Sequence, residues 1–593
     1  MHWGITNFKG LKSAELDLEP GAMTVLAGMN SSGKSSLLQS LLFAAQSLYH
    51  NGPVVLNGPL VRLGEASDLV RNGSPNTSIG LALEFSRSDG DTQDPTGVLK
   101  AQIDLVPSGD NVTLRPQRVR INRLDADAGG TLRLDKDHSR SGDLREVAEA
   151  IDGSPSTDIL HVKSLLASEK RALRTYVSFR GLVPADVIQL HSAERIASKY
   201  RQALNPILNQ LEATNKSQSA MNRLPREKEF EIFLFLREFT RLVVSELEHE
   251  DETIRSSLHP LSAARNGNPY RFESVWGDFS EEERKKAVDL AVSARARKTY
   301  VHVPLPEVSA FRTRNRDSHG LLESILKEEI HDSLQALRNL ASSLFDLADK
   351  VQYLGPLRDE PRVAWNQWNE LARGLPVGTR GEYCAVVLSR SAKHKLEYVG
   401  PGPTGELRQS TLDQAVNEWL AYLEIGDSVF AKSLGKLGVG VTLSVAGQRR
   451  DLTAVGVGVS QALPLVIAFL AAPKDSVFIV EQPELHLHPA VQSRLADFML
   501  NARPDLTTIV ETHSEAFLTR IRRRVAEGTT APSRVIITFV EPSSDGAVTR
   551  NLQLSEFGDL NEWPLGFLTS GEEDTAAILR ANLDRLKADA SAS

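Results

Sequence analysis

Residues 28–35, GMNSSGKS, have the spacing of a phosphate-binding loop, in which a glycine and four further residues precede Gly33, Lys34 and Ser35. Glycines let backbone N–H groups curl around phosphates, a lysine reaches the β and γ oxygens, and a serine hydroxyl can ligate Mg²⁺. The run MTVLA before the loop predicts a strand, and the apolar stripe after it predicts a helix, so phosphates would lie at a helix N-terminus. We therefore expect a nucleotide and Mg²⁺ here, and the later motifs must decide which class of nucleotide-binding protein this is. The expected contacts are Asn30, Ser31, Ser32, Gly33, Lys34, Ser35 and Ser36.

A second candidate site follows the apolar run SVFIV at 476–480, which predicts a buried parallel strand. The strand ends at Glu481, whose carboxylate would meet the Mg²⁺ or its water shell. ATPases of this build usually carry another carboxylate at the next position, beside the attacking water, but here it is Gln482. Glutamine can orient water by hydrogen bonding but cannot accept its proton. We expect slow hydrolysis, unless Glu484 supplies the missing carboxylate.

Two more segments could contribute to the same chemistry. The run VGVGVSQ at 455–461 places a glycine-serine turn before an apolar helix, which is another phosphate-binding device. One nucleotide does not need two such devices from one subunit, so Gly458, Ser460 and Gln461 are expected to meet the ATP of a partner. The alternative is a glycine-rich loop that caps a core helix. TTIVETHSE at 507–515 predicts a further buried strand followed by His513, a residue that in isolation is more often a structural hydrogen-bonding group.

The order of these segments resembles the ABC-type ATPases, most closely the soluble branch that contains the SMC, RecF and OLD-like proteins. The resemblance implies that residues 28–35 are the Walker A loop and that residues 455–461 stand where the signature LSGGQ would. It further implies that Glu481 is the Walker B carboxylate and that His513 is the switch histidine that senses the γ-phosphate. PELHLHP resembles the segment after Walker B in OLD-like ATPases, which approaches the dimer interface.

Four further segments resemble landmarks of prokaryotic AAA-like ATPases encoded beside nucleases or reverse transcriptases, several of which act in anti-phage defence, the Septu ATPase subunit among them. Within these segments, Arg358 and Arg362 are candidate partners for phosphate or for an acidic strand, or they simply hold a tight loop. OLD-like nucleases carry a Toprim domain with clustered carboxylates, but no DxD follows His513, so we expect any nuclease to be a separate protein. The segments are VRLGEASDLVRNG at 61–73, VQYLGPLRDEPR at 351–362, VGTRGEY at 377–383 and NEWPLGFL at 561–568.

The composition is that of an ordinary globular protein, with 41% hydrophobic and 24% charged residues. The net charge of -8 gives no global electrostatic footprint for nucleic acid. The single cysteine, Cys384, excludes an internal disulfide framework and a multi-cysteine metal site. The longest apolar run, 462–473, is too short to span a bilayer, and the first residues lack the pattern of a signal peptide. We expect a cytoplasmic protein without a membrane partner.

The predicted fold is an α/β P-loop ABC-type ATPase head with a β-meander N-lobe, interrupted by a mainly helical insertion. Its expected parts are 1–135 with Walker A, 136–350 as the insertion, 351–560 with the signature, Walker B and switch histidine, and 561–593 as a C-terminal extension. The clearest helix of the insertion lies between Leu321 and Lys350, where apolar residues recur from Leu326 to Ala348 at spacings of four and three. This pattern fits an amphipathic core helix or a short coiled-coil seam.

Our leading hypothesis is an ATP-gated switch, a homodimer or a higher even-numbered oligomer that closes around two ATPs and controls an associated effector, which we expect to be a nuclease in anti-phage defence. The alternative is an SMC/RecF-like DNA-binding ATPase in repair or recombination. A basic cluster could then contact the phosphate backbone of DNA, although such a run is more often a solvated face. The cluster consists of Arg520, Arg522, Arg523 and Arg524.

Overall fold

The computed structural model forms two compact units, each built from segments that are discontinuous in the sequence. Unit 1 comprises Met1–Glu84, Asp104–Leu114 and Ser343–Ser593, and unit 2 comprises Phe85–Ile103 and Arg115–Ser342. The domain limits expected from the sequence stay a prediction. The residues described are 1–49, 52–74, 77–86, 98–123, 131–136, 141–151, 157–166, 174–212, 226–264, 269–298, 300–305, 330–365, 377–391, 393–402, 405–562, 564 and 577–582.

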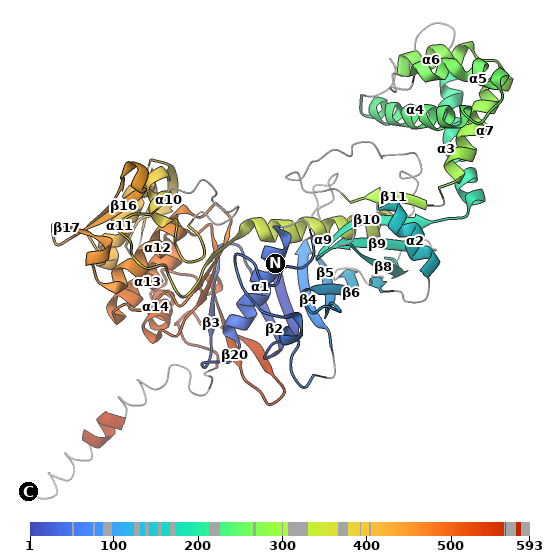
Figure 1. Cartoon of the computed structure of the whole chain (residues 1–593). Helices are drawn as coiled ribbons and strands as arrows, with labels where there is room; N and C mark the ends of the chain where they lie inside the picture. The colour runs from blue at the N-terminus through green and yellow to red at the C-terminus, as the bar shows by residue number, and fades with distance from the viewer. Residues whose placement is uncertain are drawn as a thin grey trace, which may run out of the picture. The chain divides into compact units, whose positions relative to one another are not determined.

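The centre of unit 1 is a parallel sheet with the strand order β20-β3-β19-β18-β12. Figure 1 labels β20 and β3 of this sheet. Every residue of β3, β18 and β19 is buried, as is typical of parallel strands covered on both faces. Because parallel strands end at the same edge, the residues after β3, β18 and β19 come together there. The strands are β20 (Val535–Glu541), β3 (Met23–Ala27), β19 (Thr507–Glu511), β18 (Val477–Glu481) and β12 (Val351–Leu354).

Antiparallel pairing extends this sheet beyond β20. The order continues through β21, β2, β1 and β4, with β1 antiparallel to both β2 and β4. Helix α1 (Lys34–Leu48) packs against β1 and β2, and the predicted stripe of Leu37, Leu38, Leu41, Leu42 and Ala45 is buried. The strands are β21 (Ala547–Leu552), β2 (Leu11–Asp17), β1 (His2–Phe8) and β4 (Ile79–Ser86).

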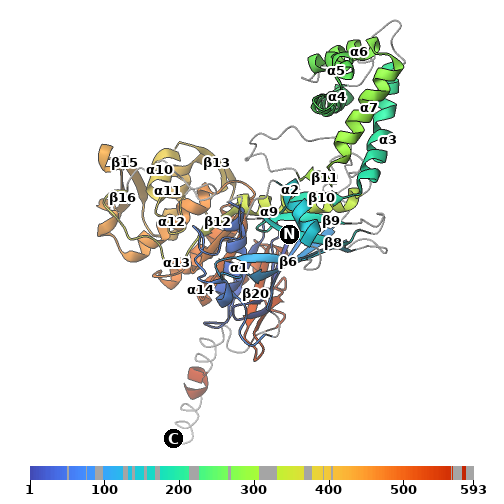
Figure 2. The same ribbon diagram turned by 45° about the vertical axis from the view of Figure 1, so that its right-hand side comes forward.

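The second half of unit 1 adds the helices α10 to α14 (Figures 1 and 2). These helices share one apolar core with β18. Aromatic rings join these helices: Phe469 contacts Phe478 and Phe498 edge-on or tilted, and Phe498 also contacts Trp419. Cys384 is free and buried in this core, as expected of a small apolar residue. The helices are α10 (Cys384–Ser391), α11 (Leu412–Leu423), α12 (Val457–Ala471), α13 (Pro489–Asn501) and α14 (Glu515–Ala526).

Smaller sheets flank these helices in the sequence. They comprise the hairpin β13 (Lys395–Val399) with β14 (Leu407–Thr411), and the sheet of β15 (Ser428–Ser433), β16 (Val439–Val445) and β17 (Gln448–Asp451).

Unit 2 is built on a sheet whose strands follow one another in sequence order from β5 to β11. The β-meander predicted within 78–135 corresponds to β4 through β7. The meander continues into the region predicted as mainly helical, which therefore also contains strands: their runs, such as TYVSFR at 175–180, are short and stand between charged segments. The strands are β5 (Val98–Pro107), β6 (Leu114–Arg123), β7 (Thr131–Asp135), β8 (Thr157–Ser164), β9 (Thr175–Arg180), β10 (Val183–Leu190) and β11 (Tyr300–Pro304).

A helical cluster separates β10 from β11 in the chain and confirms that the structure contains a helical insertion. Helices α3 and α7 run side by side, and α4 packs on α7 (Figure 2). Phe239, Phe272 and Trp276 form an aromatic core with ring centroids 5.5–5.8 Å apart. The helices of unit 2 are α2 (Ser141–Ala150), α3 (Ala193–Glu212), α4 (Arg226–Leu247), α5 (Glu252–Leu258), α6 (Pro269–Asp278) and α7 (Glu281–Ala296).

Helix α9 (His331–Lys350) matches most of the predicted amphipathic segment, and its stripe from Leu334 to Ala348 is buried. Leu326 lies outside the described residues. No helix in the described part of the chain is both long and apolar enough to cross a bilayer.

Candidate functional site

The predicted phosphate-binding loop connects the carboxyl end of β3 to α1. Gly28 has a φ of 143° and Gly33 a φ of 108°, values that L side chains rarely adopt. A Cβ atom on Gly28 would lie 2.6 Å from the carbonyl oxygen of Val540, and one on Gly33 would lie 2.8 Å from Cδ2 of Leu11. The backbone conformation therefore favours glycine at both positions, and at Gly28 the fixed backbone oxygen of Val540 also leaves no space for a side chain.

The amino group of Lys34 lies inside this loop. Its Nζ donates hydrogen bonds to the carbonyl oxygens of Gly28 at 2.9 Å and Met29 at 2.7 Å. Burial lowers the pKa of Lys34, and the negative charge of Glu511 opposes that shift. The lysine is thus held at the carboxyl end of β3, where the negative charge of Glu511 on the neighbouring strand β19 acts on it.

The other predicted loop residues differ in exposure. Asn30 and Ser31 are exposed, and Ser36 is half-buried in the first turn of α1. The hydroxyl of Ser32 is buried and makes no hydrogen bond among the described residues. Buried hydroxyls normally have a partner, and a phosphate oxygen in the loop would provide one.

Two carboxylates end the neighbouring strands β18 and β19. Glu481 and Glu511 are direct register partners in the parallel pair, and both are buried. The hydroxyl of Ser35 donates to Glu511, with its Oγ 3.0 Å from Oε1 and 3.1 Å from Oε2. Burial first, and then the charge of Glu481, raise the pKa of the Glu511 carboxyl well above its usual range, and the hydrogen bond from Ser35 opposes the shift.

Glu481 is held from the other side by β12. The hydroxyl of Tyr353 donates to Oε1 of Glu481 at 2.6 Å, and Tyr353 lies opposite Ile479 in the register of the two strands. Burial and the charge of Glu481 raise the pKa of Tyr353, so this hydroxyl stays a donor. The segment at 351–362 therefore holds the Glu481 carboxylate directly, through Tyr353.

The turn after Glu481 is fixed through its backbone. Gln482 has a φ of 44°, which is uncommon for a residue other than glycine, and its N–H donates to the carbonyl of Glu511 at 2.7 Å. Nη1 of Arg358 donates to the carbonyl of Pro356 at 2.9 Å and lies 3.4 Å from that of Gln482. Arg358 is thus a buried group that braces the turn, while Arg362 is exposed and pairs with Asp359.

Glu484 and His513 meet across the ends of β18 and β19. The backbone N–H of His513 donates to Oε1 of Glu484 at 2.7 Å, while Oε2 of Glu484 is buried without a hydrogen-bond partner among the described residues. Burial raises the pKa of Glu484, and that hydrogen bond opposes the shift. Desolvation, followed by the positive charge of Lys34, lowers the pKa of His513, which favours the neutral form of its ring.

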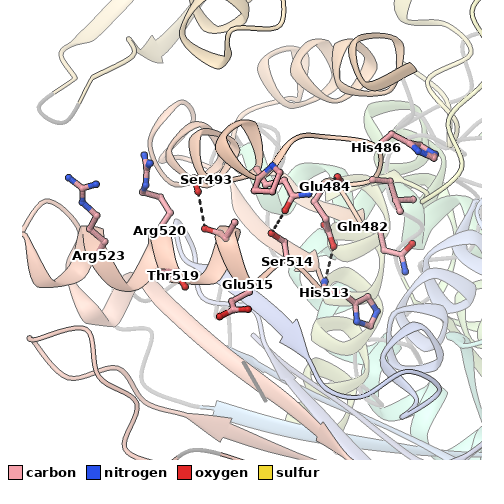
Figure 3. A pocket seen from close by; sticks show the side chains of 14 residues that line it. Gln482, Glu484, His486, Ser493, His513, Ser514, Glu515, Thr519, Arg520 and Arg523 are labelled. Carbon is pink, nitrogen blue, oxygen red and sulfur yellow. Dashed lines mark hydrogen bonds between the residues drawn. The ribbon is translucent and has the colours of Figure 1, made fainter. Parts of the chain in front are cut away.

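The three residues predicted to be catalytic, Gln482, Glu484 and His513, line one cavity of about 870 Å³. Figure 3 shows Gln482 and His513 at the same end of this cavity, and the hydrogen bond that joins Glu484 to His513. Arg520 and Arg523 of α14 lie at the other end (Figure 3). The structure therefore brings the predicted catalytic side chains together.

The glycine-serine turn at 455–461 starts helix α12. No side chain caps its first residue, Gly456, and Val457 is 59% exposed. A Cβ atom on Gly458 would lie 2.7 Å from the carbonyl oxygen of His486, so this turn packs against the segment that follows β18. Ser460 is buried and its hydroxyl donates to the carbonyl of Val457.

The basic cluster at 520–524 is paired within the chain. Arg520 and Arg524 both contact the buried carboxylate of Asp497, and Arg524 also contacts Glu527. Arg523 pairs with Glu527, and Arg522 donates to the carbonyl of Gly558. These contacts favour the reading of a structural and solvated face, and DNA binding through the cluster stays a prediction.

Comparison with known proteins agrees with this geometry. Residues 4–254 match a family described as "AAA ATPase domain", and residues 278–519 match one described as "AAA domain, putative AbiEii toxin, Type IV TA system". The first match contains the phosphate-binding loop, and the second contains Glu481, Gln482, Glu484 and His513. The chain is an AAA ATPase. The expected enzyme class is thereby confirmed, and the mixed α/β sheet with its helical insertion agrees with the expected fold class.

Individual relatives of this ATPase are distant. A segment of 176 residues, 29% of the chain, is 25% identical to the oligomycin resistance ATP-dependent permease YOR1 of Saccharomyces cerevisiae and spans only 11% of that permease. Similar solved structures include the Smc head domain of Pyrococcus furiosus with an extended coiled coil, bound to the C-terminal domain of ScpA. The two sequences are 13% identical, the match covers 93% of this chain and 96% of that chain, and the TM-score is 0.33. Another is the Smc head domain of Pyrococcus yayanosii with a coiled coil and joint. It is 14% identical, the match covers 94% of this chain and 97% of that chain, and the TM-score is 0.33.

The site of the ATPase also contains residues to which the sequence assigned no role. Glu511 ends a buried strand, TTIVE, just as Glu481 ends VFIVE, and this shared pattern was the available signal. Tyr353 and its contact with Glu481 depend on the pairing of β12 with β18, for which the sequence offers no comparable signal.

Proposed function

We propose that this ATPase is an ATP-gated switch of the cytoplasm. Two copies close around two ATP molecules, hydrolyse them slowly, and control a separate effector protein by closing and opening. The effector that we propose is a nuclease acting in anti-phage defence. ATP binds at residues 28–36 with Mg²⁺ at Ser35 and Glu481, and Gln482, Glu484 and His513 face the γ-phosphate.

The separation of the two phosphate-binding devices carries this proposal. The loop at 28–33 packs on Leu11 and Val540, whereas the turn at Gly458 packs on His486. The start of α12 has no side-chain cap and exposes Val457, so its N-terminus is accessible to a phosphate of another subunit. A second copy with its own loop opposite this turn would complete both sites.

Slow turnover follows from the turn after Walker B. Gln482 is held in a left-handed conformation by main-chain contacts on both sides and provides an amide where related ATPases have a carboxylate. An amide orients water without accepting its proton. The remaining carboxylate in the cavity, Glu484, has one oxygen occupied by the N–H of His513 and the other without a partner in the described chain. We propose that this second oxygen supports the residual hydrolysis.

Control of an effector is supported by two observations. One matched family is described by reference to a putative AbiEii toxin of a Type IV TA system. In addition, Tyr353 and Arg358 of a landmark segment shared with defence ATPases contact the Walker B strand and its turn. The alternative, a DNA clamp, has weaker support because the arginines that would grip DNA are paired with carboxylates and a carbonyl.

The switch is tested by measuring the mass of the protein in solution with light scattering, with Mg²⁺-ATP and with Mg²⁺-ADP. We expect a dimer with ATP and a monomer with ADP. Val457→Asp should keep α12 intact, because an acidic residue favours a helix N-terminus, but should repel the partner's phosphate and abolish the ATP-dependent dimer. The matched control is Val112→Asp, a change at another exposed valine of unit 1. ATP-dependent dimers of the Val457 variant would contradict the proposed contact.

The effector is tested by isolating the tagged ATPase from its native cells and identifying the proteins that co-purify. We expect a nuclease in stoichiometric amount, released or activated when ATP replaces ADP. A preparation that contains no second protein, and that binds DNA in a salt-sensitive manner, would favour the DNA-binding alternative instead.

A further inference from the structure

Glu511 lies between the phosphate-binding loop and the Walker B carboxylate. In the strand order β3-β19-β18, Glu511 is opposite Leu26 on one side and opposite Glu481 on the other. Leu26 stands two residues before Gly28. The strand that carries Glu511 is therefore the direct neighbour of the strand that leads into the loop, whereas the strand of Glu481 is one position further away.

Glu511 contacts the residue of the phosphate-binding loop that is expected to bind Mg²⁺. Both of its oxygens accept from the hydroxyl of Ser35, the group that the loop pattern assigns to Mg²⁺. Glu484, in contrast, contacts the backbone of His513 and lines the cavity with Gln482. The two carboxylates therefore have different neighbours. Glu511 contacts Ser35, whereas Glu484 lines the cavity with Gln482 and His513.

The carboxylates of Glu481 and Glu511 have no cationic partner within the described residues. Glu481 and Glu511 are 7% and 2% exposed, and neither forms an ion pair within 4.0 Å in the part of the chain that the structure describes. The amino group of Lys34 is instead bonded to carbonyls of its own loop. Two buried carboxylates side by side repel each other, and an ATP phosphate brought next to them would add further negative charge. A cation bound between the two carboxylates would reduce both their mutual repulsion and their repulsion of the phosphate.

We propose that Glu511 is a second carboxylate of the metal seat, so that Mg²⁺ is held by Ser35, Glu481 and Glu511 together and ATP binds only with the cation. The oxygen donors of these three side chains are those that a hard cation such as Mg²⁺ prefers. This inference rests on the proposed nucleotide-binding role of residues 28–36. It assigns the acidic partner of Glu481 to the next strand, in place of the position occupied by Gln482.

The test measures two equilibria that do not depend on turnover. The first is the affinity for a fluorescent ATP analogue with Mg²⁺ and with EDTA. The second is the affinity for Mn²⁺ in the presence of ADP, followed by electron paramagnetic resonance. In Glu511→Gln we expect Mn²⁺ to bind about 10- to 100-fold more weakly, the size usual for loss of a group that supports a metal. We expect the analogue to bind in EDTA at least as tightly as it binds to wild type, because the variant can place no buried negative charge at this position.

Matched controls separate the local effect from general ones. Glu541 is likewise the last residue of a strand adjacent to β3, but it is exposed, so Glu541→Gln should match wild type in both measurements. Glu511→Asp keeps the charge but shortens the side chain that meets Ser35, so it should weaken Mn²⁺ while binding the analogue in EDTA as wild type does. This variant also keeps the test decisive if the glutamine variant folds poorly.

The outcomes are distinguishable. If both Glu511 variants match wild type and Glu541→Gln in both measurements, then Glu511 is only a structural acceptor for Ser35 and the inference is wrong. Lys34→Ala should lose the analogue under every condition. If Lys34→Ala binds the analogue as wild type does, then the proposed nucleotide site itself fails, whatever the Glu511 variants show.

Discussion

The backbone N–H of His513 donates to Oε1 of Glu484 at 2.7 Å, which ties the end of β19 to the turn that follows β18. A backbone donor does not change when the histidine ring titrates or rotates, so the orientation of the Glu484 carboxylate is independent of the state of that ring. Its other oxygen, Oε2, is left buried and without a partner in the described chain. The pair therefore fixes the carboxylate in place while one of its oxygens makes no hydrogen bond within the described chain.

Glu484→Gln should abolish most of the residual ATP hydrolysis. The amide oxygen can still accept from His513, but the side chain can no longer take a proton, and loss of a general base costs about 10²- to 10⁴-fold. We expect kcat to fall within this range while the affinity for an ATP analogue is unchanged, as measured by steady-state turnover and by fluorescence titration. Unchanged kcat would show that Glu484 is not the base.

The pH dependence of turnover provides an independent check. A base must be ionised, and burial raises the pKa of Glu484 above the usual range of a glutamate, so kcat should fall as the pH decreases through that raised pKa. The same shift means that ionising Glu484 in the folded state costs stability, a cost that develops as the pH rises from its unfolded pKa through its folded pKa. Glu484→Gln should therefore gain stability over wild type in thermal melts at pH 7 but not at pH 4.

Gln482→Glu should speed hydrolysis. It places a carboxylate where related ATPases have one, and the left-handed backbone of this position is already set by the contacts of its N–H and carbonyl. A working base contributes at least about 10²-fold, so we expect kcat to rise toward that factor and the ATP-dependent dimer to shorten its lifetime. If turnover stays at the wild-type level while Glu484→Gln abolishes it, Glu484 already performs this role and the slow clamp is wrong.

Local pattern was sufficient to predict much of the fold. The strand, glycine loop and helix at 23–48 and the buried strands that end at Glu481 and Glu511 are each visible as apolar runs with a defined break. The strands β8 to β11 were not visible in the same way, because short apolar runs between charged segments do not distinguish strand from helix. These segments are strands because they pair with one another in the folded chain, and that pairing cannot be seen in the local sequence.

The candidate site divides along the same line. Gln482, Glu484 and His513 could be grouped from sequence because their strands end in recognisable turns, and the structure brings them to one cavity. The role of Glu511 could not be assigned, because it depends on β19 being inserted between β3 and β18. The charge run at 520–524 looked available for DNA, but its partner Asp497 is on α13, outside the run itself.

Gly28→Ala should damage the phosphate-binding loop. The φ of 143° is unfavourable for alanine, and its Cβ would lie 2.6 Å from a backbone oxygen of Val540 that cannot move aside. Strain of this kind costs about 1–3 kcal/mol, so we expect chemical denaturation to show a loss of that size together with weaker binding of ATP. Gly10→Ala, in the β1–β2 turn with open space around it, is the control and should leave both quantities unchanged.

Asp497→Asn should destabilise the C-terminal part of unit 1 without a direct effect on the site. Asp497 is 2% exposed and accepts from Arg520, Arg524 and Tyr422, and these hydrogen bonds and charges lower its pKa. Removing one partner of a buried ion pair costs about 3–5 kcal/mol, which urea denaturation at pH 7 would detect. Because the pKa of Asp497 is lowered in the folded state, its contribution is present above the unfolded pKa and is lost as the pH falls through the folded one, so the difference between variant and wild type should shrink in acid. Glu527→Gln, which alters an exposed partner of the same Arg524, should change stability little at any pH. Equal effects of the two substitutions would mean that the buried carboxylate has no special role, and would restore the arginines as candidates for an external anion.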